Sequence, residues 1–150
     1  IVKLGLLLVG NLGLWGAQIS QEEDIKTILG LKTWAVVGLG NNPERPALGV
    51  SKLLQNKGHR IVPVYPRAET VHGEVGYKTL SEIPFEIDVV DCFVNSNLVG
   101  KVVDEAIAIG AKAVWLQLDV IDLEAVDRAK AAGLLTVMDR CPAIEYQKQG

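Results

Sequence analysis

Short apolar runs alternate with longer helical patterns along this chain of 150 residues. Residues 33–37, Thr-Trp-Ala-Val-Val, form a run that is too short for a helix and lacks the polar alternation of a strand with one solvated face. Because strands buried on both faces have this continuous apolar pattern, such runs predict a parallel sheet. Residues 75–77 could add a minor strand. The other runs, some of which open with a polar residue, lie at 59–64, 87–94, 113–118 and 134–138.

Glycines mark the ends of the helical segments that separate these runs. The segments stop at Gly58, Gly110 and Gly133, and Asp122 is placed to cap the last of them. Helix, glycine and apolar strand thus follow one another three times, which is the pattern of βαβ units. The pattern predicts a doubly wound, Rossmann-like α/β fold, with about five or six parallel strands between two layers of helices. An antiparallel α+β fold would need short hairpin turns, and the sequence contains none.

The chain length favours one domain, which we expect to span residues 20–150. Ser20 and Glu23 form a capping box, which predicts that a helix begins there and runs to Leu29. Residues 1–19 are atypical, because no charge occurs from residue 4 to residue 20. They could be a translated upstream artefact, a signal peptide or an extra strand. We favour the artefact, since the folding signals begin only after this segment.

Composition argues against several classes of partner. The formal net charge is −3 and no basic run occurs, so neither a nucleic acid nor a membrane surface is expected as a partner. Two cysteines, Cys92 and Cys141, are too few for a disulfide framework and indicate a reducing, cytoplasmic location. His59 and His72 lack the spacing of metal ligands, so we expect no metal site. We interpret Cys92 as a core residue and His72 as a loop residue.

A glycine-containing loop follows the first apolar run and leads into a helix that begins at Pro46. Ligands of parallel sheets bind at the carboxyl ends of the strands, beside the point where the strand order reverses. Backbone N–H groups of residues 38–41 could hold phosphates there, and Arg45 could grip the same groups. The structural alternatives are a tight turn and a solvated arginine. The third glycine of the dinucleotide fingerprint is absent, because residue 43 is proline.

The end of the second run, residues 63–67, argues against NAD as the cofactor. Its sequence is Pro-Val-Tyr-Pro-Arg, without the acidic residue that usually binds the ribose hydroxyl of NAD. Arg67 could instead meet a phosphate on the ribose, which favours NADP or coenzyme A. The two prolines stiffen the segment into an extended wall suited to an adenine pocket.

Five ordered blocks carry a resemblance to a known family. They read VVGLGxxPxRP at 36–46, GHRIVPVYPR at 58–67, DVVDCF at 88–93, AIAIGAKAVWLQL at 106–118 and VMDRC at 137–141. In these blocks the chain resembles the CoA-binding domain family, stand-alone proteins related to the nucleotide domain of the succinyl-CoA synthetase alpha subunit. The resemblance implies that the glycine loop and Arg45 hold the phosphates of coenzyme A. It also implies that residues 63–66 and the loop after Phe93 frame the adenosine.

The expected cofactor-binding residues combine this resemblance with Arg67 and with Gln117, whose strand ends at the ligand edge. They are Gly38, Leu39, Gly40, Asn41, Arg45, Pro46, Pro63, Val64, Tyr65, Pro66, Arg67, Phe93, Val94, Asn95 and Gln117.

The chain departs from the family pattern at several of these positions. The family usually has Ser at residue 40, Ser-Tyr at 47–48, Asn at 65, Arg at 94 and Gly at 119. This chain lacks those hydroxyl, amide and guanidinium groups and adds a carboxylate, which predicts a weaker affinity for coenzyme A or an altered ligand. The residues present are Gly40, Ala47, Leu48, Tyr65, Val94 and Asp119.

The remaining polar residues do not form a catalytic constellation. Gln117 could contact the pantetheine arm of the cofactor or cap its strand. Cys141 could form a mixed disulfide with a thiol ligand, although we favour a buried, unreactive cysteine. We therefore expect a carrier, sensor or regulatory module that binds coenzyme A or an acyl-CoA without chemistry. The alternatives are an NADP-binding oxidoreductase and an accessory subunit of an acyl-CoA ligase, with a homodimer or an acyl-CoA enzyme as the conceivable assemblies.

Overall fold

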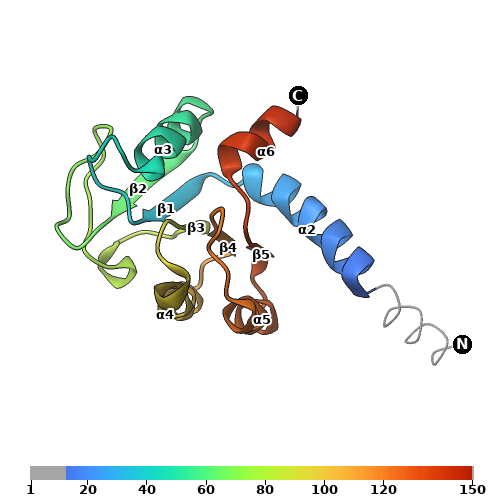
Figure 1. Ribbon diagram of the computed structural model, residues 1–150. Helices are drawn as coiled ribbons and strands as arrows, with labels where there is room; N and C mark the ends of the chain where they lie inside the picture. The colour runs from blue at the N-terminus through green and yellow to red at the C-terminus, as the bar shows by residue number, and fades with distance from the viewer. Residues whose placement is uncertain (1–12, 150) are drawn as a thin grey trace, which may run out of the picture.

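A five-stranded parallel sheet forms the centre of the molecule (Figure 1). The computed structural model describes residues 13–149, with side chains from residue 21 onward. The strands lie in the order β2-β1-β3-β4-β5, so the predicted doubly wound α/β class is confirmed. Their bounds are β1 Thr33–Val37, β2 Arg60–Val64, β3 Val89–Cys92, β4 Ala113–Leu116 and β5 Leu135–Val137.

Helices cover both faces of the sheet (Figure 1). The elements are α2 Gly13–Leu29, α3 Pro46–Asn56, α4 Ser96–Ala108, α5 Leu123–Ala131, α6 Pro142–Lys148 and the single 3-10 turn η1 Leu80–Glu82. Alternate residues of each strand enter opposite cores: Trp34 faces α2, α3 and α6, whereas Ala35 faces α4 and α5. Trp34 and Trp115 are fully buried and touch at a ring-centroid distance of 5.7 Å, as expected of packing residues. None of the described helices is long and apolar enough to span a membrane.

The order of the strands creates a crevice beside β1. From β1 the chain passes through α3 on one face to β2, and then crosses back over β1 to β3. From β3 it continues in the other direction through α4 on the opposite face. The helices α3 and α4, which follow β1 and β3, therefore leave the carboxyl edge of the sheet toward opposite faces, and this is where ligands of this fold class bind.

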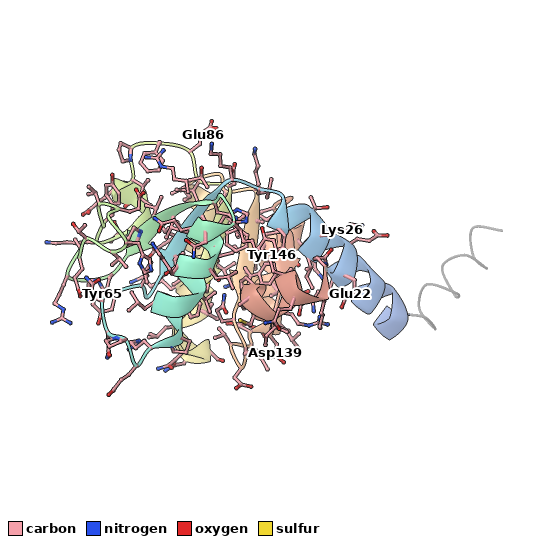
Figure 2. All side chains as sticks on the ribbon, turned by 90° about the horizontal axis from the view of Figure 1, so that it is seen from above. Glu22, Lys26, Tyr65, Glu86, Asp139 and Tyr146 are labelled. Carbon is pink, nitrogen blue, oxygen red and sulfur yellow. The ribbon has the colours of Figure 1, made fainter. Side chains whose placement is uncertain are left out.

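The carboxyl edge collects residues that are distant in the sequence. In Figure 2, Tyr65 and Asp139, which follow β2 and β5, lie on one side of the molecule. Glu86, which precedes β3, lies on the opposite side.

Three local predictions differ from the structure. The helix expected to begin at Ser20 begins at Gly13, so Ser20 lies inside α2 and the capping box is not its start. Residues 13–19 are therefore helical rather than an extra strand, and the interpretations of residues 1–12 lie outside the described residues. The possible minor strand at 75–77 is a single parallel bridge between Val64 and Tyr77. The α6 helix was not predicted, because seven residues carry too little periodicity, although Pro142 at its start is a typical signal.

The C-terminal helix is fastened to the amino edge of the sheet by a buried polar cluster. The Nδ1 atom of His59 lies 2.7 Å from the carbonyl of Leu31, and its Nε2 atom contacts the Tyr146 hydroxyl. That hydroxyl also donates to the carbonyl of Leu29 at 3.0 Å. Burial lowers the pKa of His59 and so favours the neutral imidazole. His59 thus has a structural role far from the carboxyl edge.

Candidate functional site

Two cavities open side by side at the carboxyl edge of the sheet. Cavity A has a volume of about 250 Å³ and lies between the start of α3, the end of β4 and the start of α6. It is lined by Arg45, Pro46, Ala47, Val50, Phe93, Val94, Asn95, Gln117, Leu118, Val120 and Cys141.

Cavity B has a volume of about 300 Å³ and lies over the ends of β1 and β2, beside α4. It is lined by Val37, Gly38, Arg45, Val64, Tyr65, Pro66, Lys78, Thr79, Phe93, Val94, Asn95, Leu98 and Glu105. Both cavities share Arg45 and the segment 93–95, so the two form one bent crevice with these residues at its middle.

Gly38 allows the crevice to form. Its φ is +98°, and a Cβ atom added there would lie 2.3 Å from the carbonyl oxygen of Phe93. Only glycine accepts this conformation together with so close an approach. The loops after β1 and β3 therefore touch at this point, and the crevice divides into two cavities around the contact.

Two helix starts without side-chain caps and two cations give the crevice groups that could bind an anion. The helices α3 and α4 begin at its middle, with Arg45 and Asn95 as N-cap residues, and neither has a side-chain cap. By contrast, the predicted cap of α5 is confirmed, since the Asp122 carboxylate accepts from the N–H of Ala125 at 3.0 Å. Uncapped helix starts leave donors and a positive dipole end for a ligand. Lys78 adds a second cation in cavity B, partly offset by Glu105.

A carboxylate occupies the glycine loop itself. The Glu69 carboxylate accepts from the backbone N–H of Asn41 at 3.2 Å and from its side-chain amide at 3.1 Å. Arg67 Nε lies 3.7 Å from the same carboxylate, and the side chain of Glu69 also packs against Gly40. These loop donors are therefore engaged within the protein, and the free donors lie nearer to Arg45.

The structure brings most of the predicted binding residues together in the crevice. Those that line a cavity are Gly38, Arg45, Pro46, Val64, Tyr65, Pro66, Phe93, Val94, Asn95 and Gln117. The others line neither cavity: Leu39 and Pro63 are buried, and Gly40, Asn41 and Arg67 belong to the Glu69 cluster. Asp119 also lies outside both cavities, where its N–H donates to the Asp139 carboxylate at 2.8 Å.

A buried polar pair lies beneath cavity A. Asp91 is fully buried in β3, between Val36 of β1 and Trp115 of β4, and its Oδ1 atom accepts from Nε2 of Gln117. Burial raises the pKa of Asp91 to about 8, which the hydrogen bond from Gln117 only partly opposes, so the carboxyl is neutral at pH 7. Within the described residues its Oδ2 atom has no hydrogen-bond partner. A signal existed in the sequence, namely one acidic residue inside an apolar strand.

Sequence reasoning missed several lining residues because they come from distant segments. Lys78 and Thr79 reach cavity B because the bridge at Tyr77 runs parallel to the end of β2. The other lining residues not predicted are Val37, Ala47, Val50, Leu98, Glu105, Leu118, Val120 and Cys141.

The two cysteines have different surroundings. Cys141 is partly exposed in the wall of cavity A, so the favoured interpretation as a buried, unreactive cysteine is wrong about its burial. Cys92 is confirmed as a core residue, and its burial raises the pKa of its thiol.

The remaining candidate residues have structural surroundings. His72 lies outside the crevice, where its Nε2 atom is 3.1 Å from the Ser51 hydroxyl and fastens its loop to α3. In residues 13–149 no cluster of His, Cys, Asp and Glu is arranged to hold a metal ion.

Comparison with known proteins gives consistent results. A family model described as a CoA binding domain matches residues 32–147. An uncharacterized protein of Bacillus subtilis, YneT, is 34% identical over 130 residues, which cover 86% of this chain and 96% of that protein. The alpha subunit of the ADP-forming acetate–CoA ligase II of Pyrococcus furiosus is 35% identical over 81 residues, 53% of this chain but 18% of that subunit. A solved structure of a hypothetical protein from Pyrococcus horikoshii superposes with a TM-score of 0.80 at 41% identity, covering 85% of this chain and 90% of that one.

Proposed function

The chain belongs to the CoA-binding domain family, and we propose that it binds coenzyme A or an acyl-CoA in the crevice formed by cavities A and B. The observation that carries this proposal is the position of Arg45. It is shared by both cavities and stands at the start of α3, beside the uncapped start of α4. A phosphate at this point would meet a guanidinium and two helix starts together.

The chemistry of the crevice fits the parts of the cofactor. Drug-sized ligands occupy pockets of about 300–1,000 Å³, and coenzyme A is larger than most of them, so it needs both cavities. In cavity B, Tyr65 and Pro66 offer an aromatic and apolar wall for a base, and Lys78 offers a second charge for the phosphates. Residues 63–67, at the end of β2 where NAD domains place a carboxylate, contain none, and the Glu69 carboxylate beyond them is bonded to Asn41, which supports coenzyme A over NAD.

The lining residues support binding rather than catalysis. Among the described residues that line the crevice, no histidine stands beside a nucleophile, and the one thiol is that of Cys141. We propose a cytoplasmic carrier, sensor or regulatory module. A second candidate role, as an accessory subunit of an acyl-CoA ligase, is favoured by the similarity to the Pyrococcus furiosus ligase subunit. Copurification of a larger ATP-dependent partner with the tagged chain would support that role.

Thermal stabilisation by ligands tests the proposal directly. Coenzyme A at about a hundred times its dissociation constant adds roughly 2.7 kcal/mol, which raises the Tm of a domain of this size by about 5–10 °C. Dephospho-CoA, NADP and NAD are measured in parallel, and equal or larger shifts with NADP would refute the assignment.

Two charge-removing variants of α3 and its N-cap provide the matched comparison. Arg45→Gln should weaken coenzyme A binding roughly tenfold or more, because a hydrogen bond to a charged group contributes about 1.5–3 kcal/mol. Lys52→Gln removes an exposed charge of α3 that lines neither cavity and should change the affinity less than twofold.

A further inference from the structure

A third cavity, cavity C, opens at an edge of the sheet, apart from the crevice. β2 is the edge strand there, with β1 on one side and, within the described residues, a single bridge at Val64 on the other (Figure 1). Cavity C has a volume of about 160 Å³ and shares no lining residue with cavity A or cavity B. Its walls include Arg60, Ile61, Glu74, Val75, Tyr77 and Phe85.

The main chain of Ile61 is directed toward the free edge of β2. The N–H of Arg60 donates to the carbonyl of Lys32 beside β1, and main-chain groups alternate in direction along a strand, so the next residue turns its N–H and C=O outward. Farther along the same edge, the N–H of Tyr77 donates to the carbonyl of Pro63 at 3.0 Å. In the part of the chain that the structure describes, the N–H and C=O of Ile61 have no hydrogen-bond partner.

These two unpaired groups are exceptional because Ile61 is fully buried. More than about nine in ten buried main-chain N–H and C=O groups in native proteins have a hydrogen-bond partner. Here one donor and one acceptor, adjacent on the same residue, lie beside a cavity instead. A ligand that supplies an acceptor and a donor at the spacing of a main chain would pair with both of them.

Two charged side chains of opposite sign line the same cavity. The guanidinium of Arg60 lies over the ring of Phe85, 3.8 Å from the ring centroid, and this cation–π contact holds it in place. The second charged residue is Glu74. Among residues 21–149, neither Arg60 nor Glu74 forms a salt bridge. Cavity C therefore offers one cation and one anion that the protein itself does not pair.

The remaining walls of cavity C are apolar or aromatic. Val75 is 65% exposed, and the rings of Tyr77 and Phe85 meet edge to face at a centroid distance of 6.4 Å. Since a water molecule occupies about 30 Å³ in the liquid, a cavity of about 160 Å³ has room for roughly five waters. The space thus suits one small molecule with an apolar part and is too small for a nucleotide.

From these groups we propose that cavity C binds a free α-amino acid with an apolar side chain. The carboxylate of the amino acid accepts from the N–H of Ile61 and pairs with Arg60. Its ammonium group donates to the C=O of Ile61 and pairs with Glu74. The amino acid thereby adds to the edge of β2 as a further strand residue would, with its side chain against the aromatic wall. This inference does not depend on the proposed function, because the two sites share no lining residue.

Titration calorimetry with L-valine, L-leucine and L-methionine tests the inference on the wild-type chain. At least one of them should bind with a Kd below about 1 mM, and the inference is wrong if none binds at about ten times that concentration. The N-acetyl derivative of the tightest binder lacks the ammonium charge, and its amide lacks the carboxylate. Each should bind at least about tenfold more weakly, because each loses a charge-assisted hydrogen bond.

A doubly blocked derivative distinguishes an amino acid from a peptide. The N-acetyl amide of the same residue keeps the main-chain donor and acceptor but carries neither charge. If it binds as tightly as the free amino acid, the edge of β2 recognises peptide segments, and the assignment of an amino acid is wrong.

Two variants remove the charges of cavity C one at a time. Arg60→Gln and Glu74→Gln should each weaken binding of the amino acid by about tenfold or more. Lys52→Gln and Glu23→Gln are the matched controls, because both side chains are exposed and line no part of cavity C, and each should change the affinity less than about twofold. Wild-type affinity in both Arg60→Gln and Glu74→Gln would overturn the inference.

Coenzyme A binding is measured on the same proteins to keep the two sites apart. Arg60→Gln should change the affinity for coenzyme A less than about twofold, since Arg60 lines neither cavity A nor cavity B. If the wild type binds an amino acid but no coenzyme A, the proposed function fails and this inference stands. If it binds coenzyme A but none of the three amino acids, this inference fails and the proposed function stands.

Discussion

Asp91 should make the stability of this protein fall as the pH rises through neutrality. Its carboxyl has a pKa of about 8 in the folded state, raised by burial, against the ordinary aspartate value of 3.8. Above pH 4 the unfolded chain releases this proton while the folded state retains it, so rising pH favours unfolding. The effect levels off above about pH 8, where the folded carboxyl also ionises.

The magnitude follows from the separation of the two pKa values. Between these two pKa values the free energy of unfolding falls by about 1.4 kcal/mol per pH unit. Asp91 therefore lowers the stability of the wild type by about 3 kcal/mol as the pH rises from 5 to 7. Asp91→Asn keeps the shape of the side chain and the acceptor for Gln117 but has no proton to release. The variant should therefore lack this loss and be more stable than wild type at pH 7.

Urea denaturation of both proteins at pH 5, 6, 7 and 8 measures this difference, because all other titrating groups cancel in the comparison. Asp104→Asn is the matched control: its exposed carboxylate pairs with Arg128 at 2.9 Å, and exposed pairs contribute little. If the free energy of unfolding changes with pH by the same amount in wild type and Asp91→Asn, the assignment of a neutral, buried carboxyl is refuted.

Three further predictions concern the loop, the structural histidine and the glycine turn. Glu69→Gln removes a negative charge beside the glycine loop and should tighten coenzyme A binding several-fold in calorimetry, more strongly at low salt. Burial lowers the pKa of His59, so wild type should lose stability as the pH falls below 6.5, and His59→Gln should lose less in a pH series of Tm values. Gly38→Ala should lower the free energy of unfolding, measured in urea, by more than about 2 kcal/mol, because the added Cβ atom would meet the carbonyl of Phe93. Gly58→Ala should lower it by about 1 kcal/mol, because Gly58 also has a positive φ but its Cβ atom would enter open space.

Local patterns predicted the sheet because each strand carries its own signal. Residues 33–37 are apolar on both faces, and Gly58, Gly110 and Gly133 all adopt the positive φ that a helix end requires. The same local reasoning placed Gly38 and Arg45 in the crevice, because ligands of parallel sheets bind at the carboxyl ends of the strands. The segment 93–95 was expected from the family resemblance.

The apolar walls of cavity A escaped prediction because tertiary structure creates them. Val50 and Cys141 share a wall only after α6 has packed against α3, and nothing near either residue indicates the other. The Asp91–Gln117 pair likewise depends on the register of β3 and β4, which a single sequence does not supply.

The contact between Glu69 and Asn41 changes where a phosphate can bind. A carboxylate and a phosphate compete for the same N–H groups, and here the carboxylate is part of the protein and is held next to Arg67. The family resemblance alone would place the phosphates along the whole glycine loop. With Asn41 engaged, the strongest donors left are those at the starts of α3 and α4, together with Arg45. We therefore propose that the anion site lies at the junction of cavities A and B, from which a cofactor would extend in both directions.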